Sequence, residues 1–417
     1  MTEVISQHRI RATDTALRER ARAVIPGGMY GHLSVNALPA EYPQFYRRAE
    51  GAHVWDADGN EYVDFMCSFG PILLGHQHPK VEQAAAAQRA LGDTMPGPGP
   101  VMVELAELLV DRIAHADWAI FAKNGTDATT VCLMVARAAT GRPTVLAAAG
   151  AYHGAVPWFS PGRAGVTPQD HASFRYYRYN DIASVEQAVA EGDGDVAAII
   201  VSPFRHDAGF DQEMVRPEFA RQLRALCDRI GAALVMDEVR AGFRLHDGGS
   251  WEPIGVAPDL SAWSKAIANG YPLAAVLGSA PYAEAAARIF VTGSFWFQSV
   301  PMAAAVATLG ALREEGAVPA MARIGTLLRD GLEREAAQAG VRISQTGPAQ
   351  IPNLSFPGDE NHARALAFCA TAADHGVIVH PRHNWFVCAA HTDSDVERAL
   401  AAARAGFRTV RERFGGD

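Results

Sequence analysis

The segment at residues 233–237 reads ALVMD, an apolar run that ends in a carboxylate, and it continues as MDEV through Val239. Two other apolar runs precede it, at residues 145–148 and 196–201. None alternates polar and apolar residues, which is typical of parallel strands covered on both faces. Helical patterns separate the runs, for example at residues 217–230. This βαβ rhythm predicts an α/β fold with a mostly parallel sheet and helices on both sides.

The rest of the chain divides around this sheet. A short amphipathic helix is expected at residues 14–24, and a hairpin at 51–55 and 62–65 around the turn Asp58-Gly59-Asn60. Helices at 101–113 and 126–139 flank a strand at 118–121. After residue 302 helices dominate, interrupted by strand-like pieces at 341–344 and 386–389. We therefore expect a large domain at residues 61–305 and a smaller α+β domain formed by residues 1–60 and 306–417.

The composition indicates an ordinary globular protein. Of 417 residues, 49% are hydrophobic, and 37 basic against 46 acidic residues give a net charge of −9. No basic cluster suited to nucleic acid is evident. A charged N-terminus and the lack of any apolar run of about 18 residues predict a soluble, cytoplasmic protein without membrane contact. The five scattered cysteines, without a CxxC pair, are expected to be buried and reduced, with no metal site.

Two residues carry the strongest chemical signal. Asp237 ends the apolar run, and Lys265 stands in the small-residue segment SKAIANG at 264–270. Pyridoxal phosphate chemistry needs this pair, because a lysine amine holds the cofactor as a Schiff base and a carboxylate keeps its pyridine nitrogen protonated. Either residue alone is more often an ordinary surface lysine or a strand-end cap. Their spacing and the loop composition together favour the cofactor site.

Two weaker motifs follow predicted strands. KNGTDAT at 123–129 opens a helix, so the backbone N–H groups of its Gly-Thr turn would suit a phosphate, although Asn124 or Thr126 would serve as a helix cap in any case. GAYHG at 150–154 places Tyr152 and His153 at a strand end, where an aromatic ring could stack on a cofactor. Without the other motifs, a half-buried aromatic residue is the better interpretation.

These residues belong to a longer pattern that resembles a known family. The chain is similar to the class-III aminotransferases, in the branch of glutamate-1-semialdehyde aminomutase. The resemblance covers nearly the whole chain and is specific in its order. It implies the type-I pyridoxal-phosphate transferase fold and a homodimer with active sites at the subunit interface. Its motifs are IPGG (25–28), GAHVWDADGNEYVDF (51–65), LGHQHP (74–79), KNGTDAT, AYHG, DEV, AGFR (241–244) and SKAIANG.

The resemblance also implies roles for individual residues. Asp237 would pair with the pyridine nitrogen, and Lys265 would form the Schiff base and then move the substrate proton. In the family a later Gly-Thr reaches the neighbouring subunit's phosphate. Here that loop reads TGSFWFQSVP (292–301), so Ser294 takes the place of the threonine and keeps a hydroxyl. The other expected cofactor contacts are Gly125 and Thr126 at the phosphate, Tyr152 and Val239 on the two ring faces, and His153 beside Tyr152.

The departures from the pattern narrow the expected substrate. Where the aminomutase branch has a carboxylate-binding arginine, this chain has Ser34, which cannot form a bidentate ion pair. The segments at 26–34, 93–98, 291–305 and 344–352 resemble the fumonisin-degrading members of the family, which remove one amine from a long polyol and use pyruvate. This favours bulky primary amines as donors. The candidate substrate contacts are Tyr30, Trp296, and Arg205 or Arg240 for the keto-acid carboxylate, although a structural ion pair is an equally good interpretation of Arg205.

Two other functions remain as alternatives. The first is an aminomutase or β-amino-acid aminotransferase, and Ser34 speaks against the aminomutase. The second is a cofactor-binding regulator without turnover. Such proteins usually carry a DNA-binding domain, and no segment of this chain is spare for one.

Overall fold

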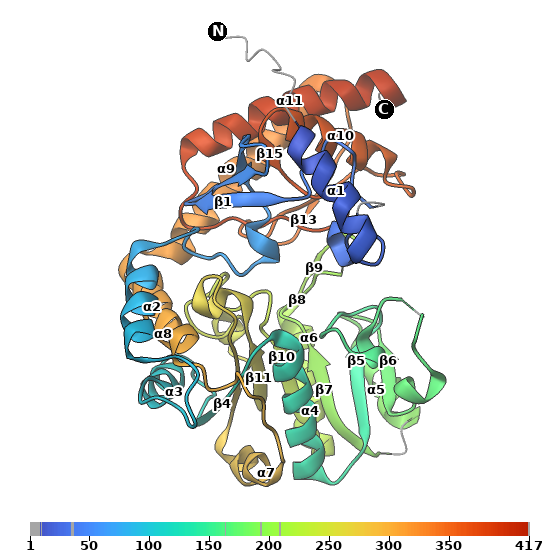
Figure 1. Cartoon of the computed structure of the whole chain (residues 1–417). Coiled ribbons are helices and arrows are strands. Elements are labelled where there is room, and N and C mark those ends of the chain that lie inside the picture. The colour runs from blue at the N-terminus through green and yellow to red at the C-terminus, as the bar shows by residue number, and fades with distance from the viewer. Residues whose placement is uncertain are drawn as a thin grey trace. The chain divides into compact units, whose positions relative to one another are not determined.

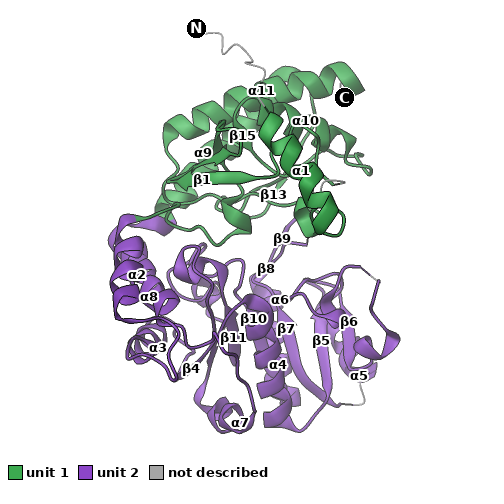
Figure 2. Cartoon of the chain, in the orientation of Figure 1, with its two compact units in different colours: residues 1–78, 208–211, 319–417 green, residues 79–207, 212–318 purple. Residues whose placement is uncertain are grey.

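The computed structural model describes residues 9, 11–34, 37–162, 164–191, 194–207 and 210–415. The chain forms two compact units (Figure 2). Unit 1 comprises residues 1–78, 208–211 and 319–417, and unit 2 comprises residues 79–207 and 212–318. The division into domains at 60/61 and 305/306 stays a prediction.

Unit 2 is built on a seven-stranded sheet of order β4-β12-β11-β10-β7-β5-β6. β12 is antiparallel to both of its neighbours, and the pairs β11-β10, β10-β7, β7-β5 and β5-β6 are parallel. The predicted parallel sheet is therefore confirmed, with one reversed strand. The strands are β4 (Trp118–Ala122), β5 (Thr144–Ala148), β6 (Phe174–Tyr177), β7 (Val196–Val201), β10 (Ala233–Asp237), β11 (Leu260–Trp263) and β12 (Ala274–Gly278), with the separate pair β8 (Phe204–Arg205) and β9 (Glu213–Met214).

Helices cover both faces of this sheet (Figure 1). Side chains alternate along each buried strand, so Val235 packs with α4 on one face while Leu234 and Met236 pack with α6 on the other. This explains the apolar runs without alternation, because both faces of the strands are dry. The helices are α2 (Pro79–Leu91), α3 (Val101–Arg112), α4 (Gly125–Thr140), α5 (Ile182–Glu191), α6 (Pro217–Ile230), α7 (Ala283–Arg288) and α8 (Ser299–Glu314).

Unit 1 holds a four-stranded sheet of order β1-β2-β3-β15, in which the predicted hairpin is confirmed as the antiparallel pair β2-β3. The short N-terminal helix is also confirmed, as α1. The elements are β1 (Tyr46–Glu50), β2 (His53–Asp56), β3 (Glu61–Asp64), β15 (Val377–Ile378), the pair β13 (Ser344–Thr346) and β14 (Asn353–Ser355), and the helices α1 (Ala12–Val24), α9 (Ala317–Ala339), α10 (Ala363–Asp374) and α11 (Asp393–Phe414).

The two strands predicted near the C-terminus need correction. Residues 386–389 form no strand, although they are buried. The amides of Phe386, Val387 and Ala389 donate to carbonyls of three separate segments, at Phe65, Gln350 and Leu73, instead of one neighbouring strand. An apolar run in a sequence indicates that the segment is buried, but not which groups its backbone hydrogen-bonds. The strand prediction was wrong for this reason. The strand expected at 341–344 is displaced, because β13 begins only at Ser344.

No helix among the described residues is long and apolar enough to cross a lipid bilayer.

Candidate active site

The two residues of the central prediction meet at one edge of the sheet in unit 2. Asp237 is the last residue of β10, and Lys265 follows the end of β11 by two residues. β10 and β11 are parallel neighbours with Asp237 opposite Ala262. Because parallel strands end at the same edge, the carboxylate and the amine point into the same region, where ligands usually bind in such sheets. Their charges interact there, since Asp237 raises the pKa of Lys265 in part.

The Lys265 amine is tuned toward its neutral form. Its pKa is lowered to about 7, first because burial disfavours the charged amine and second because the guanidinium of Arg240 repels it. Arg244 acts in the same direction, and only Asp237 opposes the shift. With this pKa about half of the amine is neutral at pH 7, and the neutral amine is the nucleophile that Schiff-base chemistry requires.

Asp237 is held in place from two sides and is 5% exposed. One carboxylate oxygen, Oδ2, accepts a hydrogen bond from His153 Nδ1 at 2.7 Å, and the other, Oδ1, accepts from the backbone N–H of Val239 at 3.0 Å. The carbonyl of His153 in turn accepts from Thr129 Oγ1 at 2.6 Å. His153 therefore orients the carboxylate, and its other ring nitrogen, Nε2, is buried without a hydrogen-bond partner among the described atoms.

The phosphate motif lies at the N-terminus of α4. Asn124 caps the helix, with its side chain accepting from the amide of Asp127 while the Asp127 carboxylate accepts from the amide of Asn124. The cap anticipated for Asn124 is confirmed. Gly125 and Thr126 begin the helix, so their backbone N–H groups carry the positive end of the helix dipole.

Close backbone packing shapes this turn. A Cβ atom on Gly125 would lie 2.6 Å from Cγ1 of Val239, and one on Gly154 would lie 2.9 Å from Cα of Thr126. Thr126 Oγ1 accepts from the backbone N–H of Ala155 at 2.9 Å. The structure thus joins the helix start, the AYHG segment and Val239 into one cradle with no room for larger side chains.

Tyr152 follows β5 in the same region and is 42% exposed. Burial raises the pKa of its phenol, and the charges of Arg240 and Asp237 also act on it in opposite directions. The ring therefore stands near the carboxylate while keeping solvent access on one side. Its stacking on a cofactor ring stays a prediction.

The two candidate arginines have different surroundings. Arg240 is buried, donates from Nη1 to the carbonyl of His206 at 3.0 Å, and has a pKa lowered to about 10, chiefly by burial. Arg205 lies on β8, where its guanidinium is 3.5 Å from the carboxylate of Glu213 on β9. The ion pair weighed for Arg205 is thus present, while Arg240 lies close enough to Lys265 to lower its pKa, and Asp237 in turn raises the pKa of Arg240.

Sequence reasoning missed two neighbours of Arg240. The pKa of His206 is well below its usual value because of burial, with Arg240 as the next cause, so its ring is neutral. The pKa of Asp207 is raised by burial, although Arg240 and the backbone N–H of Tyr152 both favour its ionised form. The segment SPFRHD contains both residues. Its run of three ionisable side chains, Arg205, His206 and Asp207, was a sequence signal that could have identified them as site residues.

The aromatic loop at residues 292–301 also belongs to unit 2. Trp296 packs against the core beside α4, and Gly293 approaches its ring so closely that a Cβ atom would lie 2.3 Å from Cδ1. Lys123 donates to the carbonyl of Phe295 at 3.2 Å, which ties the loop to the phosphate motif. Ser294 is exposed. Tyr30, 73% exposed, and Ser34 belong to unit 1, and their substrate roles stay predictions.

This donor set fits pyridoxal phosphate. A neutral lysine amine, an oriented carboxylate and a helix N-terminus lined by glycine supply the three groups that the aldehyde, pyridine nitrogen and phosphate of the cofactor require. The cradle around Gly125 and Gly154 has no room for a side chain at either position, because a Cβ atom there would collide with Val239 or Thr126. Fold and site together define a pyridoxal-phosphate enzyme of the α/β type.

Comparisons with known proteins agree with this class. The family model described as aminotransferase class-III matches residues 36–392. The aminopentol aminotransferase of Sphingopyxis macrogoltabida is 51% identical over 95% of this chain and 94% of its own length. A solved structure of the FumI protein from Sphingopyxis sp. MTA144, in a PLP form, has a TM-score of 0.95 at 50% identity, covering 96% of this chain and 97% of that chain. The glutamate-1-semialdehyde 2,1-aminomutase of Desulfatibacillum aliphaticivorans is 33% identical over 94% of this chain and 98% of its own length.

The chain therefore belongs to the class-III aminotransferases. It is a pyridoxal-phosphate-dependent enzyme that transfers amino groups, as the motifs predicted.

Proposed function

We propose that this aminotransferase takes the amino group of a bulky, hydrophobic primary amine without an α-carboxylate and gives it to a keto acid such as pyruvate. The similarity to an aminopentol aminotransferase over nearly the full length supports a large donor. The observation that carries the chemistry is the pair of Lys265 and Asp237 at neighbouring strand ends, with the pKa of the amine lowered to about 7.

Each residue of the site has a separate role in the proposed reaction. Bound pyridoxal phosphate supplies an aldehyde that condenses with amines and a ring that accepts electrons. The Nζ atom of Lys265 would hold the cofactor, and as a free amine it would take the proton from the substrate carbon and return it during transfer. Asp237, oriented by His153 and the Val239 N–H, keeps a negative charge at the ring nitrogen so that the proton there is retained.

We assign the keto-acid carboxylate to Arg240 in preference to Arg205. Arg240 is buried within the electrostatic reach of Lys265 and Tyr152, whereas the side chain of Arg205 is 33% exposed and forms an ion pair with Glu213. A guanidinium in a buried position binds a carboxylate strongly because water competes less. Burial lowers the pKa of Arg240 to about 10, so its guanidinium stays charged near neutral pH and can attract a carboxylate.

The enzyme is further proposed to be a homodimer in which Ser294 binds the partner's cofactor phosphate. The exposure of Ser294 and its place in the TGSF loop support this role. Sedimentation of the holoenzyme should give a dimer, and Ser294→Ala should weaken cofactor binding by about fivefold, the effect of one hydrogen bond. A fully loaded, active monomer would exclude the shared site.

A donor comparison tests the substrate class. Purified enzyme with pyruvate is supplied in turn with an aminopentol-like or long-chain amine, glutamate semialdehyde and a β-amino acid, and kcat/KM is compared. The bulky amine should exceed the carboxylated donors by at least about tenfold, because Ser34 offers no charge to a second carboxylate. If the carboxylated donors are faster, the aminomutase or amino-acid activity replaces this proposal.

A pair of variants sharpens the same test. Ser34→Arg should raise kcat/KM for carboxylated donors and lower it for the bulky amine, since it restores the cation of the aminomutase branch. Ser34→Ala is the matched control and should leave the ranking of donors unchanged. A shift of the ranking in the alanine variant would show that Ser34 acts by another route.

A further inference from the structure

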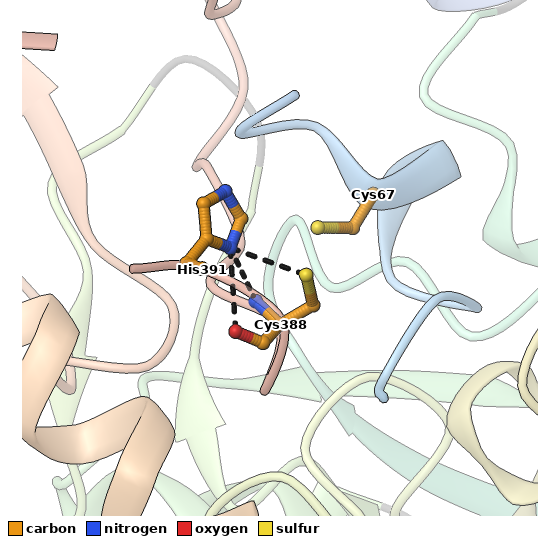
Figure 3. Close-up of side chains that lie close together, drawn as sticks. All are labelled: Cys67, Cys388 and His391. Carbon is orange, nitrogen blue, oxygen red and sulfur yellow. Dashed lines mark hydrogen bonds between the residues drawn. The ribbon is translucent and has the colours of Figure 1, made fainter. Parts of the chain in front are cut away.

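Three side chains meet in the interior of unit 1 that the transamination site does not use. Cys67 and Cys388 are each 1% exposed, and His391 is 4% exposed. One ligand atom from each residue lies within 4.8 Å of the others (Figure 3). Cys388 Sγ is 3.2 Å from His391 Nδ1. The thiol of Cys67 donates to the carbonyls of Asp64 and Phe386, each at 3.5 Å, while its sulfur lies within 4.8 Å of that of Cys388. Residues 67 and 388 are thus brought together from opposite ends of the chain.

The thiol of Cys388 differs chemically from the isolated cysteines. Its pKa is well below the usual value, first because the side chain of Cys67 lies beside its sulfur and further because of His391, although burial opposes the shift. The pKa values of Cys132, Cys227 and Cys369 are raised by burial, with Cys227 at about 12. Since the thiolate is the reactive form, Cys388 is expected to react where these three cysteines do not.

His391 is placed to exchange a proton with Cys388. Its Nδ1 lies 3.0 Å from the backbone N–H, 3.3 Å from the carbonyl and 3.2 Å from the sulfur of Cys388. In the neutral ring Nδ1 accepts from the N–H, and in the imidazolium it donates to the thiolate. The pKa of His391 is raised by the thiolate of Cys388, although burial opposes this, so the ion pair is favoured.

The same trio could be considered as a site for a soft metal ion, but the geometry points elsewhere. It has three donors, and among the described residues no fourth histidine, cysteine or carboxylate joins them. Structural zinc sites use four ligands. The proximity of the two sulfurs, which lie within 4.8 Å of each other, remains as the feature that a reaction can use.

The backbone around Cys67 is irregular and lies beside a cavity. Cys67, Ser68 and Phe69 all have left-handed φ angles, between 46° and 64°, in an irregular turn. Met66 and Ser68, on either side of Cys67, line a cavity of about 630 Å³ within unit 1. An S–S bond of about 2.05 Å requires the two sulfurs to approach by less than about 3 Å. A small oxidant in this cavity would come within one residue of Cys67, and a local movement would have to admit it to the sulfur of Cys388.

We propose that Cys67 and Cys388 form a reversible disulfide and that His391 takes the thiol proton of Cys388 in the first step. A hydroperoxide such as hydrogen peroxide is the oxidant. The Cys388 sulfur attacks one peroxide oxygen, the O–O bond breaks, and the departing hydroxide takes the proton from His391 as water. The Cys67 sulfur then attacks the resulting sulfenic acid, the S–S bond forms and a second water leaves. The two thiols lose two electrons and two protons, and the peroxide is reduced to two waters.

Formation of the disulfide would change the shape of the cavity and the position of Phe69, which lines it. Phe69, two residues after Cys67, lines the cavity and stacks on His32 with ring centroids 5.6 Å apart. A pull on Cys67 moves the turn that holds Phe69, while the bond connects segments more than 300 residues apart and restrains the unfolded chain. Oxidation is therefore expected to raise the melting temperature and to change the environment of the cavity.

The experiment treats the holoenzyme with hydrogen peroxide and maps its peptides by mass spectrometry without reduction. The expected result is a cross-linked peptide pair containing Cys67 and Cys388, removed by dithiothreitol, with Cys132, Cys227 and Cys369 unmodified. His391→Gln should slow formation of the cross-link by about tenfold, the effect of one pKa unit on the thiolate fraction. Cys388→Ser should abolish it, and Cys132→Ser is the matched control that should leave it unchanged.

Three results would overturn the proposal. The first is the absence of the cross-link in the wild-type protein, whether or not the two cysteines become sulfinic acids. The second is an equal rate in folded His391→Gln, which would remove the histidine from the reaction. The third is one equivalent of zinc in the purified wild-type protein that is lost in Cys388→Ser, which would make the trio a metal site.

Discussion

The two clusters of ionisable side chains are assembled in different ways. In unit 2, Asp237 and Lys265 meet because two parallel strands end side by side, and regular hydrogen bonding fixes their positions. In unit 1, Cys67 and Cys388 meet through irregular segments, joined by single hydrogen bonds such as that from Phe386 N–H to the Phe65 carbonyl. A sheet edge gives rigid placement for chemistry that recurs in every turnover. A junction of turns can yield, which suits a reaction that changes the backbone.

The largest effect is expected for Lys265→Ala. Turnover should fall by at least about a thousandfold, and the visible absorbance of the bound cofactor should disappear, because both the covalent anchor and the proton carrier are lost. Cys388→Ser, under reducing conditions, should stay near wild-type turnover. A Lys265→Ala enzyme that keeps its colour and activity would place the chemistry at another residue and remove the contrast between the clusters.

A smaller loss is expected for Asp237→Asn. The variant should still bind the cofactor but react about a hundredfold more slowly in a single turnover with the donor amine, because the neutral amide no longer holds the charge of the ring nitrogen. Stopped-flow absorbance measures this step directly. Unchanged single-turnover kinetics would show that the electron sink depends on a different group.

The support behind Asp237 should have a measurable effect of its own. His153→Phe removes the hydrogen bond to Oδ2 and should slow the donor half-reaction by about tenfold, within the range for a hydrogen bond to a charged group. His153→Gln, which can still donate, should recover part of the rate. Equal rates in both variants would mean that His153 acts through packing and not by orienting the carboxylate.

The smallest effect concerns pH and the cofactor-free protein. The pKa of Lys265 is about 7 in the folded protein and about 10.4 in an unfolded chain, so between these values the unfolded state binds more protons. The free energy of unfolding should rise with pH through this window, and Lys265→Met should lack that contribution. Denaturant titrations at several pH values measure the difference. If the free energy of unfolding changes with pH in the same way in the wild type and in Lys265→Met, the lowered pKa of Lys265 is contradicted.

The sequence predicts the unit 2 site well because its evidence is periodic and local. Apolar runs locate β5, β7 and β10, and parallel strands oblige Asp237 and Lys265 to share an edge. The bond from His153 to Asp237 was not predicted, since it depends on where one ring turns at a strand end. The pairing of Cys67 with Cys388 was also missed. Two cysteines in irregular segments have no sequence spacing that predicts their pairing. Residues 386–389 even have the apolar sequence pattern of a strand, although they form none.

The backbone of Lys265 has a consequence for engineering. Its φ angle of 48° is left-handed, a conformation that costs a non-glycine residue about 1 kcal/mol or more. Both the left-handed backbone and the buried amine of Lys265 thus lower the free energy of unfolding. Lys265→Gly should therefore make the cofactor-free protein more stable. A library selected for thermal resistance alone would enrich the loss of the essential residue. Directed evolution of this enzyme must therefore select for turnover in every round.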